Sequence, residues 1–263
     1  MGIHAQPAGG MNAEQFFNEV GGLPMLSPEF RPSVLLTAVA SVRRKAEPEA
    51  FPRLGDYLVP ENAAQVFERN ARATIAGIEA DEMPEDRLPE IGACLGRIEA
   101  LLPNWAPLFS IPIRYRMMQD GRISATSTLI PQTIFLGESA FRSTAFPFEE
   151  TLVHEFAHVW LDFITEAFDL QTDASPRDLV LPSGTGGKSL RGVLLAAHFA
   201  AAAGLFYSRY TQTSVARQRG DYLYDYLLGC LKSISGHPEL TPMGRIVWHA
   251  LDEFAGRREH WAA

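Results

Sequence analysis

The sequence predicts an α+β protein that is made mainly of helices and contains one small antiparallel sheet. Two observations lead to this prediction. Segments with apolar residues at helical spacing fill both ends of the chain, and a short stretch between them alternates apolar and polar residues as a half-buried strand does. With 263 residues, of which 46% are hydrophobic, the chain is long enough to bury a core without disulfide bonds.

Helical patterns dominate the first hundred residues. We expect helices over Ala13–Val20, Pro32–Ala46, 62–80 and 88–102. The second of these begins at a proline and ends in Arg43, Arg44 and Lys45, which suits the two ends of a helix dipole. The acidic run over residues 79–90 is expected to be a solvated loop between helices. Residues 13–105 would together form a helical subdomain.

An alternating pattern follows over residues 109–137. Strands are expected at 110–117, 123–129 and 133–136. Asp120 and Gly121 form a turn signal after the first of them. Pro131 marks an edge or an end of a strand, because proline cannot donate a backbone hydrogen bond to a neighbouring strand. We therefore expect a small antiparallel sheet in this region.

Helical spacing returns at Pro147 and continues toward the C-terminus. Further helices are expected over 147–168, 190–210, 215–235 and 241–261. The first of these is apolar over most of its surface, so it should be largely buried. The loop that follows it, over 169–189, is rich in Gly, Pro, Ser and Asp. Because no evident linker divides the chain, we expect a single domain over residues 13–263.

Charge and cysteine content narrow the class of protein. Lys and Arg total 23 against 31 Asp and Glu, and no basic patch stands out, so nucleic acid is not an expected partner. Cys94 and Cys230 form no CxxC pair, which indicates a reducing compartment. Residues 1–12 have no apolar segment of the signal-peptide kind and are expected to be a flexible leader. The longest apolar stretch, 193–207, is shorter than the roughly 20 residues of a membrane span, so we expect a cytoplasmic protein without membrane contacts.

An H-E-x-x-H motif lies within the expected buried helix, from His154 through Glu155 to His158. Positions i and i+4 share one helix face, with Cβ atoms about 5–6 Å apart. Two imidazoles at this spacing can bind one metal ion, and the adjacent Glu can reach a metal-bound water. The alternative is a pair of hydrogen-bonded core histidines, but a charged Glu in an apolar helix then needs compensation. We expect a metal site, with Glu155 as catalytic residue, on a zincin-like helix within a metal-binding core over residues 106–263.

A metal site needs a third protein ligand. The metzincin pattern fails, because it would require a Gly and then a His where this sequence has Leu161 and Ile164. We predict His198 as the third ligand, since its alanine-rich helix could approach closely. The competing interpretation is a core histidine satisfied by a hydrogen bond. Asp162 lies one further turn along the motif helix, but a single straight helix rarely closes three ligands around one ion. Glu166, Asp169 and Asp173 are possible ligands after a bend in the chain.

A glycine-rich loop precedes the helix of His198. Its end, Gly187-Lys188-Ser189, fits a phosphate-binding P-loop, but Pro182 stands where the first glycine of that motif belongs. We therefore expect a mobile loop rather than a nucleotide site. Arg191 lies two helical turns before His198, where it could hold a carboxylate bidentately. Its alternative role is that of a solvated residue in the first turn of a helix.

The runs over residues 124–136, 149–158 and 191–198 resemble the HExxH-motif peptide-modification proteins, which are linked with the biosynthesis of ribosomally made peptides. Some members are iron- and 2-oxoglutarate-dependent peptide β-hydroxylases. The resemblance extends over roughly residues 110–210, and the segment at 240–245 is also similar. The chain departs from the family where a His is expected shortly after Gly192-Val193-Leu194. Leu195 stands there and His198 follows one turn later, so the third ligand stays open.

The resemblance implies an iron(II)/2-oxoglutarate-dependent dioxygenase that hydroxylates a side chain of a ribosomally made precursor peptide. Arg191 would bind the distal carboxylate of 2-oxoglutarate, and Glu155 would handle water or ligate the metal. The first alternative is a zinc metallopeptidase, in which Glu155 is the general base. The second alternative is a non-catalytic protein that binds a peptide.

Overall fold

The computed structural model describes residues 11–70, 78–142, 147–210 and 213–257. These residues form two compact units. One comprises Pro32–Ala167, and the other comprises the described parts of Gly10–Arg31 and Phe168–Ala263. The division differs from the expected boundary at residue 105, because the early helices share a unit with the sheet. Most of the predicted leader lies outside the described residues.

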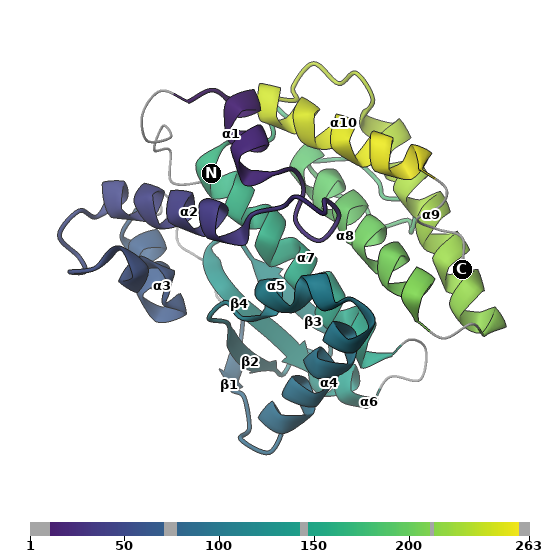
Figure 1. The fold of residues 1–263 in the computed structure, drawn as a ribbon, viewed down its shortest axis with the longest axis horizontal. Coiled ribbons are helices and arrows are strands. Elements are labelled where there is room, and N and C mark those ends of the chain that lie inside the picture. The colour runs from purple at the N-terminus through teal and green to yellow at the C-terminus, as the bar shows by residue number, and fades with distance from the viewer. Residues whose placement is uncertain (1–10, 71–77, 143–146, 211–212, 258–263) are drawn as a thin grey trace. The chain divides into compact units, whose positions relative to one another are not determined.

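The first unit surrounds one long helix with a sheet and shorter helices (Figure 1). Its helices are α2 (Pro32–Ala46), α3 (Pro60–Asn70), α4 (Leu88–Leu101), α5 (Ala106–Phe109), α6 (Glu138–Arg142) and α7 (Phe148–Ala167), with 3-10 helices η1 (Leu54–Leu58) and η2 (Pro103–Trp105). Helices α2 and α4 pack against α7, and α3 packs against a strand of the sheet. Contacts from several elements explain why α7 is apolar nearly all round.

The sheet of the first unit has four strands in the order β1-β2-β4-β3. Their bounds are Ala80–Glu82 (β1), Arg114–Met118 (β2), Ser124–Ser127 (β3) and Ile130–Gly137 (β4). Strand β4 pairs antiparallel with β3 and parallel with β2, while β1 pairs antiparallel with β2. The prediction of a mainly helical α+β fold is confirmed. The prediction that the sheet is antiparallel was wrong, because β3 and β4 form a hairpin and β2 occupies the other side of β4 in the same direction as β4.

Part of the acidic run over residues 79–90 also differs from its prediction. Residues 80–82 were expected to lie at the end of a helix or in a loop, but they form β1. The side chains of Asp81 and Glu82 are exposed, and short edge strands with outward charges are a common way to end a sheet. Helix α3 ends at Asn70, and the rest of the predicted helix over 71–77 lies outside the described residues.

The second unit is helical. It contains α1 (Ala13–Val20), α8 (Leu190–Arg209), α9 (Ser214–Ile234) and α10 (Pro242–Gly256). Helix α8 packs against α9 and α10, and α1 packs against α10 (Figure 1). Asn12, Ser189, Thr213 and Thr241 cap the four helices, each accepting a hydrogen bond from a backbone N–H in the first turn. The caps explain why these helix starts lie within one or two residues of those expected from the sequence.

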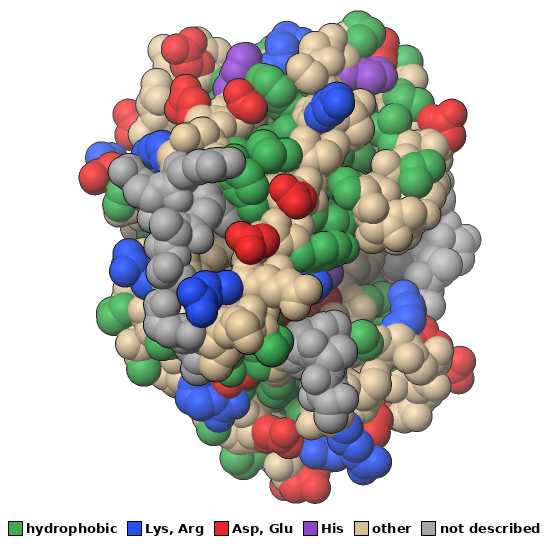
Figure 2. Space-filling view, turned by 90° about the vertical axis from the view of Figure 1, so that its right-hand side faces the viewer, with side chains coloured by type: hydrophobic (Ala, Val, Ile, Leu, Met, Phe, Trp, Pro, Cys, Tyr) green, Lys and Arg blue, Asp and Glu red, His purple; other side chains and the backbone are tan. Residues whose placement is uncertain are grey.

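Helix α8 is 20 residues long and apolar enough to cross a membrane by length and composition alone. However, 72% of its most apolar window is buried inside the protein. Such burial is the pattern of a core helix in a soluble protein. Figure 2 shows charged side chains of both signs interspersed over one face, a mixture that is also typical of soluble proteins.

Candidate metal site on the HExxH helix

A stripe of partly buried residues runs along helix α7. From Glu149 to Ala167 every residue is buried except His154, His158, Asp162 and Thr165. These positions are spaced by four, four and three residues, so they lie along one helix face. The stripe therefore gives the motif histidines access from outside a helix that is otherwise enclosed.

The two motif histidines point their Nε2 atoms at each other. The atoms are 2.8 Å apart, and the rings are 4.5 Å apart between centroids at an interplanar angle of 81°. In one arrangement of protons this contact is a hydrogen bond, but two converging ring nitrogens also suit a shared metal ion. Within the described ranges no group of three His, Cys, Asp or Glu side chains is placed to hold a metal. The structure thus brings two predicted ligands together.

Glu155 faces the sheet. Its side chain is 2% exposed, and α7 packs here against β3, where the Ser124 and Thr126 hydroxyls hydrogen-bond to the carboxyl group. One carboxyl oxygen, Oε2, is buried without a hydrogen-bond partner in the described part of the chain. Burial raises the pKa of the Glu155 carboxyl to about 7, against the opposing effect of the two hydroxyls, and the nearby Asp162 carboxylate raises it further. Such a group can hold or release a proton near neutral pH.

The predicted third ligand, His198, belongs to the second unit. Its side chain is fully buried, and its Nε2 lies 2.9 Å from the Pro24 carbonyl oxygen. This contact is what a core histidine makes. It is also what a metal ligand makes, since ligating histidines usually hydrogen-bond through their other ring nitrogen. The assignment of His198 as a metal ligand stays a prediction.

Arg191 lies at the start of α8 in the second unit. Its backbone N–H donates to Gln171 Oε1 at 2.7 Å, and its side chain is half-buried rather than solvated. The loop before it is pinned at its base, where Leu179 and Lys188 exchange two backbone hydrogen bonds. Its role in binding a carboxylate remains a prediction from the sequence.

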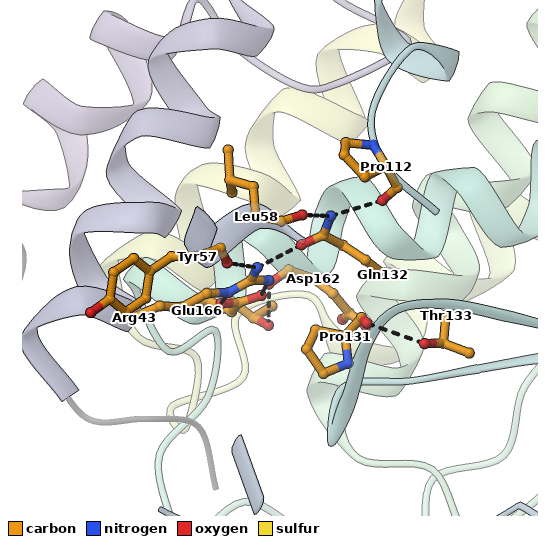
Figure 3. Close-up of polar contacts among 10 residues, drawn as sticks. Arg43, Tyr57, Leu58, Pro112, Pro131, Gln132, Thr133, Asp162 and Glu166 are labelled. Atoms are coloured by element: carbon orange, nitrogen blue, oxygen red, sulfur yellow. Dashed lines mark hydrogen bonds and ion pairs between the residues drawn. The ribbon is translucent and has the colours of Figure 1, made fainter. Parts of the chain in front are cut away.

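Glu166 is occupied by another partner (Figure 3). It accepts two hydrogen bonds from the buried Arg43, from Nε at 2.8 Å and from Nη2 at 2.7 Å. A carboxylate committed to a bidentate ion pair is a poor metal ligand, so this acidic alternative is not supported. Figure 3 also places Asp162, on the partly exposed stripe, beside the same pair.

The pair belongs to a larger buried network. Arg43 Nη1 also donates to the Tyr57 carbonyl oxygen at 2.8 Å and to Gln132 Oε1 at 2.5 Å. Gln132 in turn donates from Nε2 to the carbonyl oxygens of Leu58 and Pro112, at 2.7 and 2.8 Å. The network connects α2, η1, β4 and α7, and so fixes the end of α7 beyond the motif. In the sequence, Arg43 lies in the basic run that ends a predicted helix, and this position did not indicate that its side chain is buried.

No family model matches the chain, and no curated protein matches its sequence. The candidate site therefore rests on the described geometry and on the resemblance carried by the motif segments.

Proposed function

We propose that the protein is a metal-dependent enzyme, and specifically an iron(II)/2-oxoglutarate-dependent dioxygenase that hydroxylates a side chain of a ribosomally made peptide. One observation carries the proposal. His154 and His158 direct their Nε2 atoms to within 2.8 Å of each other, on the partly exposed stripe of a buried helix. A helix that is enclosed elsewhere and exposes paired imidazoles is suited to bind a metal that a substrate can reach.

The residues present fit such an ion. His154 and His158 would hold it as neutral imidazoles, and the sequence suggests His198 as the third ligand. With O2 as the oxidant and 2-oxoglutarate as the co-substrate that is oxidised to succinate and CO2, the metal would supply the chemistry for hydroxylating a carbon–hydrogen bond. Glu155 would orient a water or a substrate group, because its buried carboxyl hydrogen-bonds to β3 hydroxyls and its Oε2 atom has no partner among the described residues. Arg191 would bind the distal carboxylate of 2-oxoglutarate.

The choice of an oxygenase over other metal enzymes rests on the resemblance in residues 124–136, 149–158 and 191–198. The same resemblance supports a precursor peptide as the partner. With two cysteines and no CxxC pair, a cytoplasmic location fits both.

A zinc metallopeptidase is the second candidate. The observation that favours it is the position of Glu155, beside the histidine pair and with Oε2 lacking a described partner. A general base for water needs an accepting oxygen of this kind. Glu166, later in α7, is less suited to be the general base, because it is paired with Arg43.

The deciding experiment is co-expression with a precursor peptide encoded beside the protein, followed by mass measurement of the peptide. A gain of one oxygen atom supports the oxygenase, and two fragments support the peptidase. An unmodified peptide, together with purified protein that binds neither iron nor zinc, would overturn both and leave a peptide-binding protein. The His154→Ala variant is the control, since it should abolish either modification while leaving α7 folded.

A purified system then separates the metals. Protein prepared without oxygen is analysed for iron and zinc, and iron-loaded protein is assayed for succinate formed from 2-oxoglutarate. We expect succinate to depend on iron, on oxygen and on the peptide.

A further inference from the structure

Thr151 lies one turn before Glu155 on α7, on the same side of the helix. Its side chain is 3% exposed, and its hydroxyl oxygen, Oγ1, has no hydrogen-bond partner among the residues that the structure describes. Threonine hydroxyls in helices commonly donate to a backbone carbonyl of the preceding turn. Thr165, on the same helix, does so to the Asp162 carbonyl at 2.8 Å. Thr151 is therefore an exception within its own helix.

A second exceptional atom lies on the next turn. Glu155 Oε2 is also buried, and it too has no partner in the described ranges. Residues at i and i+4 have Cβ atoms about 5–6 Å apart, which is close enough for one small group to contact both side chains. Buried polar atoms in native proteins are nearly always hydrogen-bonded, and two exceptions on adjacent turns indicate a common partner.

We propose that Thr151 and Glu155 form one polar subsite on α7 that holds a single buried water molecule. The water would donate one hydrogen bond to Glu155 Oε2 and share another with the Thr151 hydroxyl. Water is the ligand that fits, because buried waters typically make two to four hydrogen bonds to polar groups that otherwise lack partners. The neighbouring Leu152 and Phe156 are fully buried and offer no competing polar atom in their side chains.

The subsite makes Thr151 a positioning residue for Glu155. Hydroxyls of β3 hydrogen-bond to the carboxyl group, and the water would add a partner at its Oε2 atom. The orientation of the carboxyl beside the histidine pair would then be fixed by both. Only this catalytic consequence rests on the proposed function, since the water itself does not require it.

The test is a double-mutant cycle on the thermal unfolding of metal-free protein, with Thr151→Val, Glu155→Leu, which removes both carboxyl oxygens, and the double variant. Valine keeps the shape of threonine but removes the hydroxyl. We expect Thr151→Val to lower Tm by roughly 2–4 °C, and the two shifts to be non-additive because both residues share one partner. Thr151→Ser, which keeps the hydroxyl, should preserve the coupling to Glu155, whereas Thr165→Val should show none.

Two results would overturn the subsite. An unchanged or raised Tm for Thr151→Val would show that the hydroxyl is unsatisfied, since replacing such a group with a methyl usually stabilises a protein. Additive shifts in the cycle would show that no partner is shared.

The catalytic consequence has its own readout. Thr151→Val should lower kcat for the peptide with KM unchanged, and Thr151→Ser should restore kcat. If no peptide is turned over by any variant, the proposed function fails, while the unfolding data still decide whether the subsite exists.

Discussion

Glu155 and Glu166 lie about three turns apart on the same helix and are both buried, with 2% and 8% of their surfaces exposed, yet their surroundings are opposite. Glu166 accepts two hydrogen bonds from Arg43, and that guanidinium also contacts the faces of Phe67 and Phe163. Glu155 is held by uncharged hydroxyls and has an oxygen without a described partner. Two buried carboxylates on one helix therefore have different hydrogen-bond partners.

The two carboxylates differ in the groups with which they pair. A buried charge is costly unless it is paired, and Arg43 removes that cost at Glu166. At Glu155 the cost appears as the raised pKa, about 7. Folding alone does not require a buried carboxyl with a raised pKa beside two convergent histidines. Groups with strongly shifted pKa values are concentrated at functional sites, which supports the proposed role of Glu155.

The largest loss of stability should come from removing the ion pair between Arg43 and Glu166. Arg43→Met leaves Glu166 buried without its cation and removes a donor from Gln132, so we expect a loss of about 3–5 kcal/mol in the free energy of unfolding. Urea denaturation followed by circular dichroism measures it. The matched control is Arg142→Ala, which removes an exposed ion pair with Glu138 and should cost about 0–1 kcal/mol. Equal losses for the two variants would contradict the structural role of the network.

Exchanging each carboxylate for an amide tests the comparison directly. Glu155→Gln should lower kcat by roughly 10²–10⁴-fold with little loss of stability, because it removes a proton-accepting group and a buried charge. Glu166→Gln should lower the free energy of unfolding while the folded fraction keeps its kcat. Peptide mass spectrometry and urea denaturation measure the two quantities on both variants. If both variants lost the same amounts of kcat and of stability, the proposed catalytic role of Glu155 and the structural role of Glu166 would not differ.

Structural features that depend on neighbouring residues were predicted from the sequence better than features that depend on distant segments. Helix starts depend on local caps and apolar spacing, so α1, α2 and α8 begin where they were expected. Strand direction depends on which distant segment a strand meets. Hence β3 and β4 were found as strands, while the parallel pairing of β2 with β4 was missed.

The site shows the same limit. The i, i+4 spacing of His154 and His158 is local, and it correctly placed both rings on one face. The partners of Glu155 come from β3, and the partner of Glu166 comes from α2, more than a hundred residues earlier. Ser124, Thr126 and Arg43 carry no local signal for these contacts, since serine, threonine and arginine are ordinary surface residues in any sequence.

The His198→Gln variant tests whether a residue outside α7 contributes to the proposed metal site. His198→Gln should lower the metal content of the purified protein, as His154→Ala does, if the ligand prediction is right. It should also cost about 1 kcal/mol of stability through the contact with Pro24. Metal analysis and urea denaturation are made on the same samples. Full metal content with only the loss of stability would identify His198 as a core histidine.

The smallest effect concerns the two buried cysteine thiols. Burial raises the pKa of the Cys94 thiol to about 12, with a further rise from the Glu149 carboxylate, and burial raises that of Cys230 to about 12. Both thiols should be protonated at pH 8 and should resist iodoacetamide until the protein unfolds in urea. Because thiols in the unfolded chain ionise first, near pH 8.5, stability should fall slightly as the pH rises above that value. Mass spectrometry counts the labels, and rapid labelling of Cys94 in the folded protein would show that the packing of α4 against α7 opens readily.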